Sequence, residues 1–302
     1  MSFTAIILLV VSACVHAGWN LVCKRQHPTQ TFFFLAGAVG VLLFMPVAIC
    51  YWAEIQQIPP RVWLLLLASG FFMALYYIAL AGAYRTGDMS IAYPLARSSP
   101  ILVVTFVSLV MGRGHEIGRV AVVGIILVVL GCFLLPMRRF TELRLRNYWN
   151  TCCLLALLAA IGTAGYTIID DRALEILRGP PDYRFRPMAA AFVYLFLEAI
   201  SSLFWQGLGL LATGTERRSF LRQLPSQMKP AAIAGAGIFL AYGLALTAMA
   251  FVRNVSYVAA FRQLSIPIGA GLGIVLLEEP CHTPRLVGVA TILAGLLLVG
   301  LG

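Results

Sequence analysis

Charged residues are few in this sequence. Only 11% of the 302 residues are charged and 61% are hydrophobic, whereas a soluble domain typically carries about 25% charged and about 45–50% apolar residues. This balance excludes a soluble enzyme and a disordered protein. The apolar blocks are unbroken, which argues against a transmembrane β-barrel, because its strands alternate apolar and polar residues.

Motifs for catalysis and metal binding are missing as well. The sequence contains no HExxH pair, Walker loop or nucleophile elbow, and its seven cysteines lack the paired spacing of zinc sites and the density of a disulfide scaffold. We therefore expect no enzyme activity, no cofactor and no metal. The net charge of +10 comes from basic residues spread thinly along the chain, so we expect no nucleic-acid partner.

What the sequence has in abundance is long apolar segments. Ten membrane spans of about 20 residues would use roughly 200 positions, which leaves only short loops. Pairs and clusters of glycine and proline separate the segments. We expect an all-α integral membrane protein with ten transmembrane helices and both termini on one side. The expected helices are 3–23, 31–52, 62–84, 88–111, 117–136, 149–170, 187–211, 230–252, 254–277 and 283–301.

Weak internal similarity divides these helices into two copies. One shift along the chain pairs Tyr76 with Tyr242, and another pairs residues 16–20 with 163–167. Each copy holds five helices, an odd number, so the second copy must insert upside down relative to the first. This predicts an inverted five-plus-five repeat, the architecture of alternating-access transporters that bind substrate near the midplane. The two expected repeats are 1–148 and 149–302.

Two groups of residues resemble family signatures. His16-Ala17-Gly18-Trp19-Asn20 with Lys24 is similar to the first-helix signature of the EamA-like ten-helix permeases in the drug/metabolite transporter superfamily. Residues 253–256, 262–263 and 278–280 resemble the carboxy-terminal signature of that family. The resemblance implies a multi-pass transporter of a bacterial inner (plasma) membrane, and the His-Ala-x-Trp-Asn start resembles a branch associated with phosphonate use. It does not specify a substrate, because relatives move amino acids, sugars, nucleotide sugars, phosphorylated metabolites and drugs.

Three charged residues fall deep inside expected spans: Arg97, Arg262 and Glu198. A charge at the middle of a membrane helix costs roughly 2.5–3.5 kcal/mol on insertion scales, so each is a candidate for function. The two arginines occupy near-equivalent places in the repeats, and an anionic group between them would satisfy both. Alternatively, each arginine bonds carbonyl groups freed by nearby prolines. Glu198 could bind a substrate amine, exchange a proton or pair with an arginine.

Further polar and aromatic residues could line the same site. They share a helical face, lie beside the arginines or are mates in the two repeats, and they are His16, Trp19, Asn20, Tyr76, Tyr93, Tyr166, Thr167, Tyr242 and Gln263. A lone histidine in a helix is more often structural, and tyrosines near helix ends usually belong to the interfacial belt. A structural role for His16 and an interfacial position for the tyrosines therefore stay open.

The acidic group Asp170-Asp171 with Glu175 comes at the end of the expected sixth helix. Arg172 and Arg178 accompany it. We interpret this segment as a solvated face of ion pairs rather than a metal site.

The sequence therefore favours a secondary transporter for a small anionic or zwitterionic metabolite: a phosphonate, a phosphate ester or an amino acid. An exporter of hydrophobic or cationic compounds and a lipid-headgroup flippase are the alternatives. The expected partners are a small-molecule substrate and membrane lipids. Because both repeats lie in one chain, a monomer can be complete, and a homodimer stays open.

Overall fold

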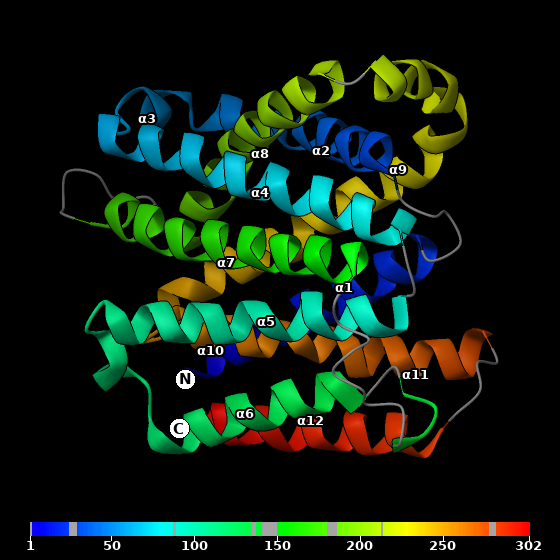
Figure 1. The fold of residues 1–302 in the computed structure, drawn as a ribbon. Helices are drawn as coiled ribbons and strands as arrows, with labels where there is room; N and C mark the ends of the chain where they lie inside the picture. The colour runs from blue at the N-terminus through cyan, green and yellow to red at the C-terminus, as the bar shows by residue number, and fades with distance from the viewer. Residues whose placement is uncertain are drawn as a thin grey trace.

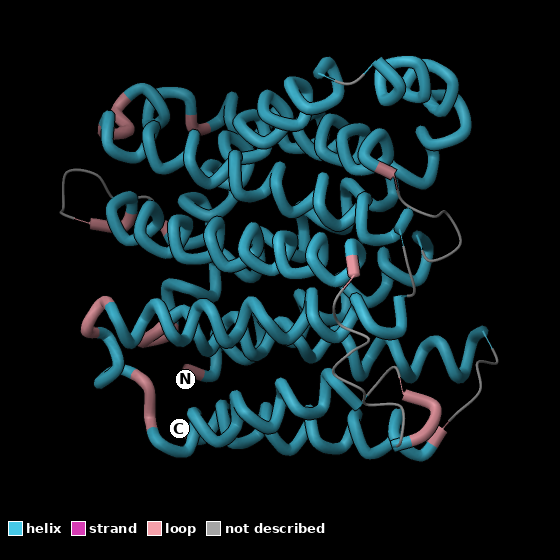
Figure 2. The backbone as a smooth tube through the Cα atoms, viewed as in Figure 1, coloured by secondary structure: helices cyan, strands magenta, loops and turns pink. Residues whose placement is uncertain are grey.

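The fold is entirely helical in the part of the chain that the structure describes. A computed structural model describes residues 2–23, 29–86, 89–134, 137–140, 150–179, 186–212, 214–277 and 282–302. Outside this description also fall the side chains at 20–23, 84, 89–98, 212, 214–219, 221, 273 and 277. Within these ranges the backbone forms helices, turns and loops, and no strand (Figure 2).

Long helices run side by side across the molecule (Figure 1). In chain order the elements are α1 (Phe3–Cys23), α2 (Gln30–Cys50), α3 (Trp52–Gln56), α4 (Pro60–Thr86), α5 (Met89–Val110), η1 (Arg113–Glu116), α6 (Arg119–Leu134), α7 (Thr151–Leu177), α8 (Pro187–Ala212), α9 (Gly214–Ala248), η5 (Met249–Phe251), α10 (Val255–Phe261), η6 (Arg262–Leu264), α11 (Ser265–Leu277) and α12 (Thr283–Leu301).

Their lengths and composition suit a membrane. In the described residues, seven segments are long and apolar enough to cross a bilayer, and three shorter apolar helices, Phe3–Trp19, Ser99–Val110 and Arg119–Leu134, accompany them. These ten segments fall where the sequence predicts spans. The predicted all-α membrane fold is confirmed.

Three of the predicted helices differ in detail. The span expected at 254–277 is broken into α10, the 3-10 turn η6 and α11. Helix α7 continues past residue 170 to Leu177. Asp170 is fully buried within this helix and is not part of a loop. Helix α9 begins at Gly214 instead of near 230 and contains two prolines. The polar residues before 230 predicted a loop, but polarity only places a segment outside the apolar layer and does not prevent a helix.

Side-chain caps set the starts of several helices. Thr29 Oγ1 accepts a hydrogen bond from the Phe32 amide at 3.2 Å, and Asn150 Oδ1 accepts one from the Cys153 amide at 2.8 Å. Asn254 Oδ1 does the same for α10. Each cap satisfies an amide that the first turn leaves without a helical partner. Polar residues just before the apolar runs therefore fix where these helices begin.

Helix contacts recur in matched pairs between the two halves of the chain. Helix α1 packs on α9 as α7 packs on α4, and α2 packs on α9 as α8 packs on α4. Helix α5 packs on α7 as α11 packs on α1, while α2 meets α8 and α6 meets α12. This pattern is the one that two interlocked copies of one five-helix unit would give. The boundaries 1–148 and 149–302 stay a prediction.

Small residues allow the closest of these contacts. A Cβ atom added to Gly70 would lie 2.2 Å from Ser201 Oγ, where α4 crosses α8, and one added to Gly235 would lie 2.3 Å from the Ala36 oxygen, where α9 crosses α2. These two crossings are equivalent in the matched pairs. Close backbone approach at glycine supplies much of the packing between membrane helices.

Helices α6 and α12 pack together along one edge of the molecule (Figure 1). A Cβ atom on Gly124 would lie 2.5 Å from the Gly295 oxygen, and one on Gly295 would lie 2.6 Å from the Gly124 oxygen. The two backbones therefore touch directly at this point, with no room for a side chain on either helix.

The two chain ends lie at the same end of the helix bundle (Figure 1). Ser2 Oγ donates to the Phe251 carbonyl at 2.9 Å, and a Cβ atom on Gly118 would lie 2.7 Å from the Gly302 oxygen. The α5–α6 connection, the start of α10 and both termini thus share one side, which we call the terminal side.

We expect Gly124→Ala to destabilise the protein by about 1–3 kcal/mol, because the added methyl group overpacks a backbone-to-backbone contact. Thermal unfolding in detergent micelles measures this. The matched control is Gly271→Ala, since Gly271 has no atom within 4 Å of an added Cβ. If both substitutions lower the melting temperature equally, the close contact does not hold these helices together.

Candidate functional site

Two carboxyl groups lie completely buried in the bundle. Asp170 on α7 and Glu198 on α8 both have 0% of their surface exposed. A buried charge is costly unless hydrogen bonds and opposite charges compensate it. Their partners therefore define the polar centre of the molecule.

Hydroxyl groups from three other positions surround Asp170. Ser69 Oγ on α4 lies 2.5 Å from Asp170 Oδ1, and Tyr194 OH donates to the same oxygen at 2.8 Å. Tyr242 OH on α9 donates to Asp170 Oδ2. Hydrogen bonds to an ionised group are the stronger kind, worth about 1.5–3 kcal/mol each. Four helices thus converge on one carboxylate.

Glu198 on α8 also contacts Ser69. Ser69 Oγ lies 2.8 Å from Glu198 Oε1. Glu198 Oε2 is buried and has no hydrogen-bond partner among the described residues. Ser69 therefore links the two carboxyl groups, and one oxygen of Glu198 is an unused acceptor.

Arg262 brings a positive charge to this centre from the broken ninth span. Its guanidinium carbon lies 4.9 Å from the ring centroid of Tyr242 and 5.9 Å from that of Tyr166, a cation–π geometry. Among the described residues its guanidinium makes a single long hydrogen bond, 3.4 Å to Tyr166 OH. Arg262 acts electrostatically on both Asp170 and Glu198. The residue is half-buried, so its other N–H groups can serve a ligand.

The helix break explains how Arg262 is presented. It lies in the 3-10 turn η6, between α10 and α11. Pro267 follows in α11 and has no amide hydrogen for the Gln263 carbonyl, so a regular α-helical bond is missing there. Broken helices with unpaired backbone groups line substrate sites in transporters.

A row of aromatic rings extends from the arginine across the bundle. Tyr166 and Tyr242 have ring centroids 5.5 Å apart, and Tyr76 lies 6.1 Å from Tyr166. Tyr76 also contacts Tyr77, whose ring stacks on Phe33 at 4.9 Å. Tyr242 is 6% exposed and bonds a buried carboxylate, so it lies inside the bundle rather than in an interfacial belt.

The other predicted site residues lie around this row. His16 and Trp19 contact each other edge to face at 5.0 Å, and Trp19 packs against Gly237. Trp19 Nε1 and Gln263 Oε1 are buried without a hydrogen-bond partner among the described residues. The Thr167 hydroxyl donates to the Thr163 carbonyl of its own helix at 2.7 Å.

The structure therefore brings together one part of the predicted site. Arg262, Tyr166 and Tyr242 contact one another, and Glu198 joins them through Ser69 and Asp170. The side chains of Asn20, Tyr93 and Arg97 lie outside the described residues. The predicted pairing of two arginines around an anion stays a prediction.

The interpretation of Asp170 as part of a solvated loop was wrong. Only the neighbouring pair Arg172–Glu175 fits that description, with side chains 49% and 59% exposed. The signal was present in the sequence, because the polar face of Thr163 and Tyr166 continues to Asp170 one turn later.

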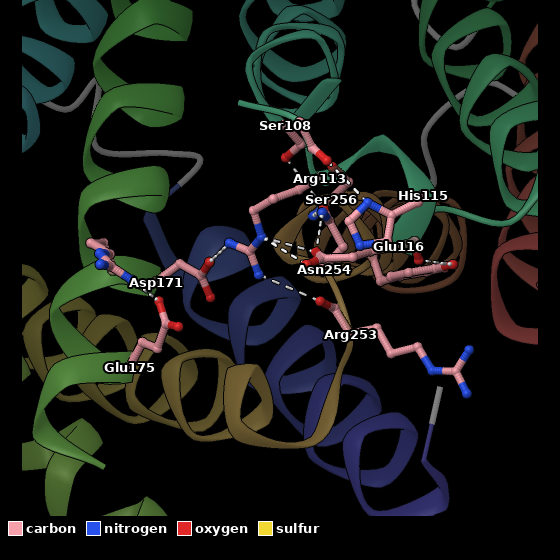
Figure 3. Close-up of polar contacts among 12 residues, drawn as sticks. Ser108, Arg113, His115, Glu116, Asp171, Glu175, Arg253, Asn254 and Ser256 are labelled. Carbon is pink, nitrogen blue, oxygen red and sulfur yellow. Dashed lines mark hydrogen bonds and ion pairs between the residues drawn. The ribbon is translucent and has the colours of Figure 1, made fainter. Parts of the chain in front are cut away.

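A second polar network lies on the terminal side of the bundle. We call it the Arg113 network, and it comprises Arg113, Glu116, Asp171 and Asn254 (Figure 3). Arg113 Nη1 lies 2.9 Å from Asp171 Oδ2, and Arg113 Nε lies 2.9 Å from Glu116 Oε2. Asn254 Nδ2 donates to Glu116 Oε2 at 2.9 Å. The network ties the α5–α6 connection to α7 and to the start of α10.

Protonation of Glu116 would weaken this network. Partial burial acts to raise the pKa of Glu116, but the hydrogen bonds from Arg113 and Asn254 outweigh it and lower that pKa below its ordinary value. A lowered pKa means that this stabilisation is present at neutral pH and lost as the pH falls through the lowered value. The network is therefore complete under neutral conditions.

We expect a double-mutant cycle of Arg113→Ala and Asp171→Ala to give a coupling free energy of about 0.5–3 kcal/mol in thermal unfolding. Arg113 is 33% and Asp171 14% exposed, so solvent screens this pair less than it screens the Arg172–Glu175 pair. The Arg172–Glu175 pair on the same helix is the control, and exposed pairs typically give about 0.2–1 kcal/mol. Equal coupling in the two cycles would show that the Arg113 network does not hold the terminal side closed.

Comparisons with known proteins agree with this architecture. Residues 3–137 match the EamA-like transporter family. No curated protein matches the sequence. A solved crystal structure of a protein that is 15% identical superposes with a TM-score of 0.67, over 100% of this chain and 98% of that protein's chain. This last likeness shows the fold alone. Residues 3–137 are thus similar to a family of membrane transporters, not of enzymes, and the described chain has a multi-pass helical membrane fold.

Proposed function

We propose that the protein is a secondary transporter that moves a small anionic or zwitterionic metabolite across the membrane by alternating access. A phosphonate, a phosphate ester and an amino acid are the candidates. The observation that carries the proposal is Arg262, a half-buried residue on a broken span whose guanidinium makes a single long hydrogen bond among the described residues.

An anion suits this arginine because of its shape and its surroundings. A guanidinium offers paired donors to the oxygens of a carboxylate, phosphate or phosphonate. The rings of Tyr166 and Tyr242 support it from the side and leave its edge for the ligand.

The same geometry disfavours a hydrophobic or cationic substrate. A cation would seek the faces of Tyr166 and Tyr242, but Arg262 already occupies them. Glu198 Oε2, which has no hydrogen-bond partner among the described residues, could accept a hydrogen bond from a substrate amine. A zwitterion could therefore place its anionic group at Arg262 and its amine toward Glu198.

Alternating access requires one side to be closed while the other is open. The Arg113 network supports this, because it bonds a connection of the first half of the chain, at Arg113 and Glu116, to Asp171 and Asn254 of the second half. We propose that it holds the terminal side closed in this state. The matched helix contacts of the two halves support rocking of one half against the other.

Lipids and a small-molecule substrate are the partners this proposal needs. A monomer suffices, because both halves of the site belong to one chain. We place the protein in the inner membrane of a bacterium on the strength of its resemblance to the EamA-like permeases.

A ligand panel tests the proposal. Phosphonates, phosphate esters, amino acids, dicarboxylates and cationic drugs are added to the detergent-purified protein, and its melting temperature is measured. A ligand at about 100 times its Kd stabilises the folded state by roughly 2.7 kcal/mol. We expect stabilisation by anionic or zwitterionic compounds, lost in Arg262→Ala and partly retained in Arg262→Lys.

Two controls accompany the panel. Arg61→Ala removes an exposed arginine at the start of α4 and should leave the stabilisation unchanged. Arg97→Ala tests the second arginine of the predicted pair. Stabilisation by hydrophobic cations alone, or an unchanged response in Arg262→Ala, would overturn the proposed substrate class. Selective stabilisation by lipid headgroup phosphates would instead favour a flippase.

A further inference from the structure

The hydrogen bonds of Ser69 require one more proton than its hydroxyl provides. Ser69 Oγ lies 2.5 Å from Asp170 Oδ1 and 2.8 Å from Glu198 Oε1. A serine hydroxyl has a single hydrogen, and an ionised carboxylate only accepts. For both contacts to be two-centre hydrogen bonds of this short length, one carboxyl group must be protonated and donate to Ser69. We infer that Glu198, Ser69 and Asp170 form a proton-binding site, with the proton on Glu198, that couples transport to proton movement.

The partners of the two carboxyl groups decide which one carries the proton. Asp170 accepts hydrogen bonds from the hydroxyl groups of Tyr194 and Tyr242, as well as from Ser69. Glu198 contacts Ser69 and the Asp170 carboxyl group, and among the described residues no donor bonds its Oε2. An ionised carboxylate needs donors, whereas the carbonyl oxygen of a neutral acid tolerates burial at lower cost. Asp170 is therefore the carboxylate and Glu198 the acid.

The charges around Glu198 balance in that state. Among the described residues, the groups that interact with it are Ser69 and Tyr77 from α4, Asp170 from α7, Tyr194 from its own helix, Tyr242 from α9, and Arg262 from η6. Helix α2 also packs on α8 and carries no charged residue. Ionised Asp170 offsets Arg262, and a neutral Glu198 adds nothing. If Glu198 ionised, the described centre would carry an uncompensated negative charge.

This charge balance makes binding of the proton and of an anion mutually favourable, a step that rests on the proposed function. An anion at Arg262 adds a negative charge to a centre that already holds Asp170. Loss of the proton from Glu198 would add another. The anion therefore holds the proton in place, and by reciprocity the proton favours the anion. The predicted mode is proton–anion symport.

The proton site also connects directly to the Arg113 network. Asp170 bonds inward to Ser69, while the next residue, Asp171, pairs with Arg113 on the terminal side. A movement of α7 that separates Asp170 from Ser69 would also shift Asp171. Proton release and opening of the terminal side would then share one helix.

Infrared spectroscopy of the protein purified in an alkyl maltoside detergent, which has no ester carbonyl group to absorb in the same region, tests the proton site without any substrate. A protonated carboxyl group has a carbonyl stretching band above the amide region. We expect this band at neutral pH in the wild type and in Glu175→Gln, which replaces an exposed glutamate of α7. Glu198→Gln should abolish it while keeping a side chain of the same shape. The band should disappear from the wild type at high pH.

Ser69→Ala provides a second readout of the same site. If Glu198 donates to Ser69 Oγ, removal of that acceptor should move the band to higher wavenumber. Absence of the band in the wild type at neutral pH, or its survival in Glu198→Gln, would overturn the inference. An unchanged band position in Ser69→Ala would do the same. Because no ligand is present, these outcomes do not depend on the ligand panel.

Discussion

The structure depends on the need to satisfy a carboxylate buried among membrane helices. Asp170 meets it with hydroxyl groups from Ser69, Tyr194 and Tyr242, so α4, α7, α8 and α9 must all converge on one point. Two of these three partners also make a second contact, and Ser69 makes its own with Glu198. The tyrosine ring that serves Asp170 from α9 also supports Arg262. Tyr242 thus stabilises both charges of the site, the carboxylate of Asp170 and the guanidinium of Arg262.

Around this centre the bundle divides into contacts that can change and contacts that cannot. Where Gly124 meets Gly295, two backbones touch, and such packing admits little sliding. The Arg113 network consists of ion pairs and hydrogen bonds at a partly exposed end, which break at lower cost. Helix α7 links the buried centre to this network, because its consecutive residues Asp170 and Asp171 bond to Ser69 and Arg113. The rigid α6–α12 contact joins the two halves of the chain, so rocking of the halves must leave it in place while the Arg113 network separates.

Much of the fold could be predicted from the sequence, because apolar runs of membrane-spanning length leave few alternatives. The matched tyrosines and the deep Arg262 and Glu198 were visible for the same reason: polar groups are rare in such runs. Asp170 was not, since its neighbours are charged and a charged segment suggests water. Ser69 carries no signal, because a lone serine in an apolar helix is common. Three-dimensional convergence, not composition, gives these two residues their roles.

The most direct test of the central claim is uptake of labelled candidate metabolites into proteoliposomes that contain the purified protein. Wild-type protein should accumulate an anionic or zwitterionic compound above the level in empty vesicles, and Arg262→Ala, inserted in equal amount, should not. Uptake of hydrophobic cations alone, or uptake of the same anion by Arg262→Ala at the wild-type rate, would contradict an anion site at Arg262.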